Sequence, residues 1–127
     1  MEGLLKIGFI AAGGAAGAVA RYLVNISPLA DVFERFPLPT LVINISGSFL
    51  IGVLVIVLTD RLAVSENIRF AIIVGFLGAF TTFSTFEMDI YDLAKERFLF
   101  SALIYTMLSV VVGFLAVIAG LRLGRTF

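Results

Sequence analysis

The chain has 127 residues, of which 61% are hydrophobic and 14% are charged, an apolar share well above the roughly half that is typical of soluble domains. Nine basic residues balance nine acidic ones, so the chain lacks the basic excess that binding to nucleic-acid phosphates demands. Without Cys or His it cannot form disulfides, thiolate nucleophiles, imidazole bases or the commonest soft-metal sites. Together with a mean hydropathy of +1.13, this composition predicts a small integral membrane protein with no nucleic-acid partner.

Four apolar segments follow one another along the chain, and each is long enough to cross about 30 Å of hydrocarbon as a helix. They cover approximately residues 5–26, 39–59, 68–91 and 98–121. The polar links between them are too short to hold a separate domain. We therefore expect an all-α fold with a single transmembrane domain, residues 1–127, whose first apolar segment is a retained span and not a cleaved signal peptide.

The basic residues are divided almost evenly between the two sides of such a four-helix protein. The side that holds both termini carries Lys6, Arg61, Arg69, Arg122 and Arg125, and the other side carries Arg35, Lys95 and Arg97, with Arg21 near its edge. Because a Lys/Arg excess sets orientation, so small a difference permits insertion both ways, and the chain could pair with an inverted copy of itself. The alternative is a single orientation set by Arg122 and Arg125.

Small and polar side chains recur every fourth residue on the second and fourth segments, so they share one face of each helix. The second segment carries Thr40, Asn44, Ser48 and Gly52, and the fourth carries Ser101, Tyr105, Ser109 and Gly113. In lipid, such faces either join helices or line a path, and hydroxyl residues serve in both roles. Asn44 is the sharper signal, because an amide inside the membrane needs partners and can offer its NH₂ group to an anion.

The first segment is rich in glycine and alanine. Gly13 and Gly17 stand in GxxxG register, which lets another backbone approach closely and predicts a packing face. Arg21 follows at the end of this face. Its long side chain could reach the membrane interface or pair structurally, or it could hold a positive potential over an anion entry.

The third segment contains the most informative run, GFLGAFTTFSTF, from residue 75 to residue 86. Its glycines and hydroxyl residues weaken a helix and offer the backbone other hydrogen bonds, so we expect the helix to be broken at mid-membrane. Non-helical backbone at that depth survives only inside protein or beside a cavity. Freed carbonyls could coordinate a cation there, and N–H groups and hydroxyls could meet an anion. Phe83 and Phe86 could turn their positive ring edges toward that anion, or could simply fill space.

At these residues the chain resembles the Fluc/CrcB family of dual-topology fluoride channels of bacteria and lower eukaryotes. The string TTFSTF carries the resemblance, supported by Gly13-Gly14, Gly17-Ala18 and Arg21-Tyr22 in the first segment and by Thr40 to Asn44, Gly47 and Gly52 in the second. The resemblance implies an antiparallel homodimer with two fluoride pathways and a structural sodium ion at its interface. It also implies passive export of fluoride across the cell membrane, in bacteria the plasma or inner membrane, which lowers fluoride toxicity without enzymatic turnover.

The same resemblance assigns roles to particular residues. Main-chain carbonyls of Gly78 and Thr81 would hold the sodium ion. The fluoride pathway would use Asn44, Phe83, Phe86, Ser84, Thr85, Tyr105, Ser109 and Arg21. Three positions depart from the common family pattern: Ala79 and Pro39 stand where many members have glycine, and Gly113 stands where a further serine can occur.

Two other classes of membrane protein fit part of the pattern. A small multidrug exchanger is also a four-helix, dual-topology dimer, but it needs a carboxylate in its first helix, and the first segment here has none. Glu87 and Asp89 follow the TTFSTF string, so a proton-coupled role stays open. In a non-transporting scaffold subunit the polar faces would only pack helices. We do not expect an enzyme, because the hydroxyl residues have neither an imidazole base nor an evident catalytic carboxylate pair.

Overall fold

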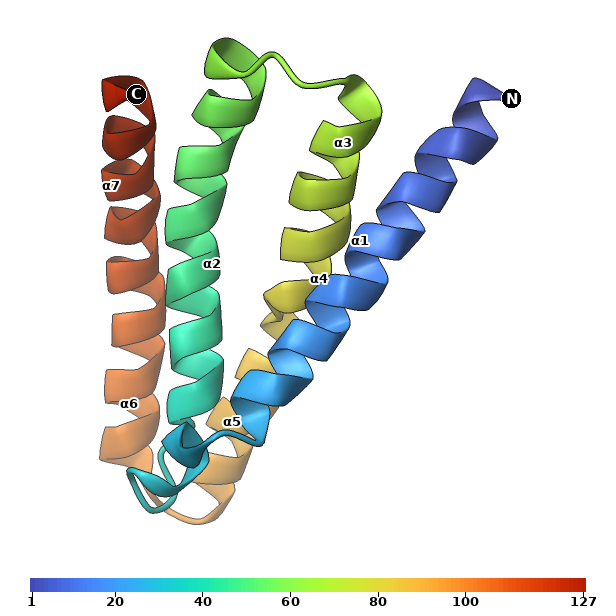
Figure 1. Ribbon diagram of the computed structural model, residues 1–127. Coiled ribbons are helices and arrows are strands. Elements are labelled where there is room, and N and C mark those ends of the chain that lie inside the picture. The colour runs from blue at the N-terminus through green and yellow to red at the C-terminus, as the bar shows by residue number, and fades with distance from the viewer.

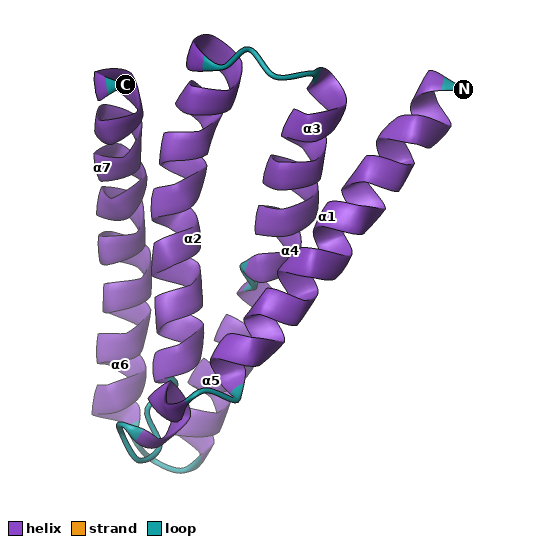
Figure 2. Ribbon diagram, in the orientation of Figure 1, coloured by secondary structure: helices purple, strands orange, loops and turns teal.

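The computed structural model describes all 127 residues, and its secondary structure is entirely helical (Figure 2). Four helical spans are long and apolar enough to cross a membrane: Glu2–Asp31, Leu38–Arg61, Glu66–Lys95 and Leu99–Thr126. The predicted all-α fold with four membrane-spanning helices is therefore confirmed. The spans extend beyond the predicted apolar segments, because charged residues such as Glu2, Arg61 and Lys95 continue the helices past their apolar parts.

Each of the four spans consists of two or more helical pieces. The first contains α1 (Glu2–Asn25) and the 3₁₀ turn η1 (Pro28–Asp31), and the second contains α2 (Leu38–Ile56) and the π-helical η2 (Val57–Arg61). The third contains α3 (Glu66–Phe70), the π-helical η3 (Ala71–Leu77), α4 (Gly78–Phe80) and α5 (Phe83–Lys95). The fourth contains α6 (Leu99–Met107), the π-helical η4 (Leu108–Val112) and α7 (Gly113–Thr126).

The spans pack mainly as two pairs, with both termini at the same end of the molecule (Figure 1). One pair consists of α1, which lies obliquely, and the η3 and α4 part of the third span. The other consists of α2 and α7, which run side by side. Contacts between the two pairs are fewer, so the third span and α2 leave space between them for a site.

Glycine lets the helices of each pair approach closely. A Cβ atom at Gly13 would collide with the carbonyl of Ala71, and one at Gly17 with the carbonyl of Phe76. The predicted packing face of the first segment is thus confirmed. In the other pair, a Cβ atom at Gly52 would lie 2.5 Å from the carbonyl oxygen of Val117. Such contacts are typical of membrane helices, where small residues replace the hydrophobic effect as the basis of association.

Two residues of extended backbone separate α4 from α5. Thr81 has φ −78° and ψ 157°, and Thr82 has φ −151° and ψ 122°. Close to this interruption, a small buried cluster joins α5 and α6 to the start of α2, and it includes Leu41, Phe86 and Tyr105. The packed cluster fixes α5 relative to α2, so the side chains on both sides of the interruption have defined positions.

Candidate functional site

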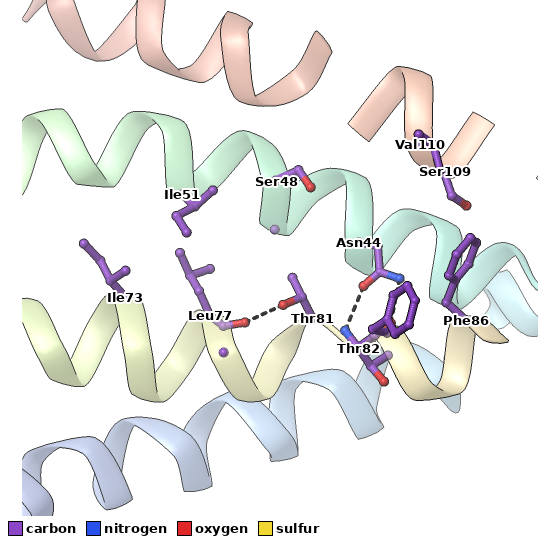
Figure 3. A pocket seen from close by; sticks show the side chains of 13 residues that line it. Asn44, Ser48, Ile51, Ile73, Leu77, Thr81, Thr82, Phe86, Ser109 and Val110 are labelled. Atoms are coloured by element: carbon purple, nitrogen blue, oxygen red, sulfur yellow. Dashed lines mark hydrogen bonds between the residues drawn. The ribbon is translucent and has the colours of Figure 1, made fainter. Parts of the chain in front are cut away.

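A groove of about 440 Å³ lies beside the interruption, between the third span and α2, with η4 at one end (Figure 3). One part of its wall is apolar and includes Ile51, Ile73 and Leu77. The other part carries Asn44 and Ser109 beside the ring of Phe86. No acidic or basic side chain lines the groove. An occupant would therefore meet amide, hydroxyl and main-chain groups together with aromatic rings.

The side chain of Asn44 holds the extended segment by two hydrogen bonds. Its Nδ2 donates to the carbonyl of Thr82 at 3.0 Å, and its Oδ1 accepts from the N–H of Thr82 at 2.9 Å (Figure 3). An amide NH₂ group has two hydrogens, so one donor of Asn44 remains for another partner. We expected an amide that could serve an anion, and the pairing with the main chain of Thr82 was not anticipated.

Two main-chain carbonyls lose their usual helical partners at the interruption. In a continuous α-helix the N–H of Thr82 would bond to the carbonyl of Gly78, but here it donates to Asn44. In the same way, the N–H of Thr85 would bond to the carbonyl of Thr81, but it donates to the hydroxyl of Thr82 at 3.2 Å. The carbonyls of Gly78 and Thr81 are thus available for other partners. They are also the two carbonyls that the family resemblance assigns to sodium.

These carbonyls suit an alkali cation better than any side-chain cluster in the chain does. No group of three or more Asp, Glu, His or Cys residues comes together in the structure. Carbonyl oxygen is a good ligand for a hard cation. Gly78 is exposed, and a Cβ atom there would meet nothing within 4 Å, so its backbone is open on the outer side of the chain. The donor set and its access fit an alkali cation.

The two rings of the TTFSTF string differ greatly in burial. Phe83 is 73% exposed and Phe86 is 8% exposed, and their ring centroids lie 6.0 Å apart at an interplanar angle of 50°. Both rings line the groove. Phe86 also packs against Tyr105, with centroids 5.3 Å apart. Phe86 is therefore anchored in the chain, whereas Phe83 stands at the open side of the groove.

Tyr105 lies outside the groove lining and is fully buried. Its hydroxyl donates to Oδ2 of Asp89 at 2.9 Å. The presence of Asp89 within a span is a signal in the sequence for this hydrogen bond, because a carboxylate there needs a hydrogen-bond donor. We had considered Asp89 only as a possible proton-coupling group.

The remaining residues of the predicted pathway are distributed as follows. Ser109 lines the groove, and its buried Oγ has no hydrogen-bond partner in the chain. Ser84, Thr85 and Arg21 lie outside the lining. The Nε of Arg21 is also buried without a partner. The groove thus brings together Asn44, Phe83, Phe86 and Ser109 with the backbone of Gly78 and Thr81. It adds Ser48, which was predicted only as part of a polar face.

Comparisons with known proteins identify a matching family and several relatives of this chain. The family model described as CrcB-like protein, Camphor Resistance (CrcB), matches residues 8–121. A relative named fluoride-specific ion channel FluC, from Agrobacterium fabrum, is 43% identical over 96% of this chain and 98% of its own. A relative of the same name from Solibacter usitatus is 41% identical over 95% of this chain and 99% of its own. Another, from Methylococcus capsulatus, is 45% identical over 95% of this chain and 53% of its own.

Proposed function

The chain belongs to the CrcB-like family, as its sequence pattern predicted, and we propose that, like the relatives named fluoride-specific ion channels, it conducts fluoride passively across a membrane. The family is one of ion channels and not of enzymes. The four apolar spans make the chain a multi-pass membrane protein. Passive efflux would lower fluoride toxicity in the cell, and the bacterial sources of the matched relatives suggest a plasma or inner membrane.

The observation that carries this proposal is the uncharged groove that combines the Asn44 amide, two phenylalanine rings and an unpaired hydroxyl. Fluoride is small and strongly hydrated, so a selective path must replace its water with close donors. Asn44 supplies its second N–H, and Ser109 supplies an O–H. The rings of Phe83 and Phe86 supply positive edges, as expected for an aromatic quadrupole. Neutral donors bind an anion without holding it permanently, which conduction requires.

A second copy of the chain would complete the channel. Phe83 and the backbone of Gly78 are exposed in the single chain, and the groove is open beside them. We propose an antiparallel, dual-topology homodimer with one pathway formed along each groove. Carbonyls of Gly78 and Thr81 from both copies would hold a structural sodium ion between them. The ion would supply a fixed positive charge and would join the two interrupted spans. Of the remaining pathway residues, Ser84, Thr85 and Arg21 would then line the approaches to each groove, whereas the buried Tyr105 would support the ring of Phe86.

The alternative functions have less support. A multidrug exchanger needs an accessible carboxylate in its path, but the groove contains none and Asp89 already accepts from Tyr105. A scaffold subunit would have no use for an unpaired hydroxyl such as that of Ser109, because a buried polar group without a partner costs about 1–3 kcal/mol. The channel gives this group a partner.

A flux assay with the purified protein in liposomes tests the proposed function. We expect rapid fluoride efflux and little chloride efflux, with a strong loss of fluoride efflux in Phe83→Ile and in Asn44→Asp. An imposed pH gradient should not drive transport. Fluoride efflux no faster than chloride efflux, or equal efflux in all three proteins, would refute the proposal.

A further inference from the structure

Phe36 lies at the end of the connection between the first two spans, close to the start of α2. Its backbone is constrained on both sides, because Arg35 before it has a left-handed φ of 64° and Pro37 after it limits the conformations open to Phe36. The carbonyl of Phe36 also accepts from the N–H of Leu38 at 2.8 Å. The direction of the Phe36 side chain is therefore set by the turn that carries it.

The side chain of Arg35 attaches this turn to the residues between α5 and α6. Its guanidinium group lies over the ring of Phe98, 5.1 Å from the ring centroid, and its Nη1 lies 3.8 Å from Oε2 of Glu96. Each of these contacts is weak at an exposed site. Together they join two connections at the same end of the molecule and keep the turn in place.

The ring of Phe36 packs against the ring of Tyr105, which in turn packs against Phe86. The centroids of Phe36 and Tyr105 lie 5.8 Å apart at an interplanar angle of 85°, and those of Tyr105 and Phe86 lie 5.3 Å apart. A T-shaped pair is directional, because the positive edge of one ring meets the negative face of the other. Three rings from different parts of the chain thus form a continuous row from the surface connection to the groove.

A second cavity, of about 320 Å³, lies beside Phe36. Phe33, Phe36 and Asp89 belong to its lining, whereas Tyr105 does not. The ring of Phe36 therefore separates Tyr105 from this space. Buried rings keep one orientation because close-packed neighbours surround them. Loss of the Phe36 ring would let Tyr105 move toward the cavity and away from Phe86.

We propose that Phe36 is a positioning residue for the fluoride path, which acts through Tyr105 to hold the ring of Phe86 with its edge toward the groove. This inference rests on the proposed fluoride conduction and extends it to a residue outside the groove lining. The ring of Phe86 lies beside Asn44 in the groove (Figure 3). Its edge attracts an anion, but its face repels one. A small rotation of the ring would therefore weaken its interaction with the ion.

Phe36→Leu tests the proposal, because leucine is apolar but has no ring to meet Tyr105. Fluoride efflux is measured as the rate per active liposome, separately from the fraction of liposomes that are active. We expect Phe36→Leu to lower the rate about three- to tenfold, the factor that corresponds to the loss of one aromatic pair. Phe36→Tyr keeps the ring and should conduct at the wild-type rate. Phe33→Leu is the matched control, because Phe33 lies in the same connection, is 55% exposed and pairs only with the ring of Phe36, and its rate should be unchanged.

A double variant shows whether the effect of Phe36 passes through Tyr105. Once Tyr105→Leu has broken the row of rings, adding Phe36→Leu should lower the rate no further. Losses that multiply in the double variant would overturn the proposal. If Tyr105→Leu does not yield a folded protein, Phe36→Tyr decides instead, and a rate as low as that of Phe36→Leu would overturn the proposal.

A purely structural role for Phe36 predicts a different result. It would lower the fraction of active liposomes and leave the rate of each at the wild-type value. That outcome for Phe36→Leu, or for Phe36→Met if the leucine variant does not fold, would overturn the positioning role and leave the proposed function intact. A wild-type protein that passes no fluoride would overturn both.

Discussion

Asn44 combines two roles in one amide. Its Oδ1 and one hydrogen of Nδ2 are engaged by the main chain of Thr82, which keeps the third span interrupted. The other hydrogen is left for an occupant of the groove. Since the side chain that holds the backbone is also the proposed donor to the ion, that donor is fixed in position before any ion arrives. A preorganised donor of this kind does not have to be ordered when the ion binds.

Asn44→Leu should separate the structural role from the conducting one. Leucine has a similar volume but cannot bond to the N–H and the carbonyl of Thr82, which are partly buried, at a cost of about 1–3 kcal/mol for each group. We expect a clearly lower thermal unfolding temperature in detergent, followed by circular dichroism, together with loss of fluoride flux. Asn25→Leu, at the exposed end of α1, is the control and should unfold like the wild type. An unchanged unfolding temperature for Asn44→Leu would contradict the proposed clamp.

The two rings of the groove should respond differently to replacement by isoleucine. Phe86 is almost fully buried and packs on Tyr105, so Phe86→Ile should lower both stability, by about 1 kcal/mol, and flux. Phe83 is largely exposed in the single chain, so Phe83→Ile should lower flux with little effect on chain stability. Unfolding curves and liposome flux on the same preparations measure both quantities. Equal losses of stability in the two variants would show that Phe83 is also a packing residue of the single chain.

Residue types revealed much of this groove from the sequence, but their hydrogen bonds did not follow. Asn44 stood out because burying an amide inside a membrane costs free energy, so such a residue usually has a functional or structural role. Its pairing with Thr82 depends on how α2 lies against the third span, and no local pattern encodes that placement. Tyr105 and Asp89 are 16 residues apart on different helices, and only the packing of α5 against α6 brings them together.

At the scale of the elements, glycine determines which helices form pairs. Gly13 and Gly17 place α1 directly on the backbone of η3, in the part of the third span that precedes the interruption. The position of α1 therefore supports the site, although no residue of α1 lines the groove. A small displacement of α1 should therefore shift the third span and alter the groove.

Gly17→Ala should disturb this interface, because the new methyl group would collide with the carbonyl of Phe76. We expect a lower unfolding temperature and a reduced fluoride flux. Gly8→Ala in the same helix is the matched control, since its methyl group would meet nothing within 4 Å and alanine favours a helix by about 1 kcal/mol. The control should be as stable as the wild type or slightly more so. Equal behaviour of the two variants would mean that α1 does not need its close approach.

The sequence predicted the number and order of the helices better than their internal form. Long apolar segments separated by short polar links are sufficient to define four spans. The π-helical segments η2, η3 and η4 were not predicted, because one wider turn hardly alters the spacing of apolar residues. The close packing of α1 was predicted, because Gly13 and Gly17 form a motif with a direct steric meaning.

For the whole molecule, the distribution of basic residues bears on how the open side of the groove could be covered. Basic residues flank both ends of the spans, with Lys6, Arg61 and Arg125 at the end that holds the termini and Arg35 at the other end. Because neither end has a marked excess, we expect the chain to have no strong preference for one orientation. Two oppositely inserted copies could then place their interrupted third spans against one another, which would cover the exposed Phe83 and Gly78.

Insertion in both orientations can be measured with one introduced cysteine, because the natural chain has none. Glu34 is suitable, since its side chain is 90% exposed and lies in the connection before α2. In cells carrying Glu34→Cys, a membrane-impermeant maleimide should label about half of the protein from outside and the remainder only after permeabilisation, as expected for a nearly unbiased charge distribution. Added lysines at one end should shift this ratio and lower fluoride flux together, because one orientation alone cannot form the proposed antiparallel dimer. Labelling entirely from one side, with full fluoride flux, would exclude that dimer and would require the groove to conduct in parallel or single copies.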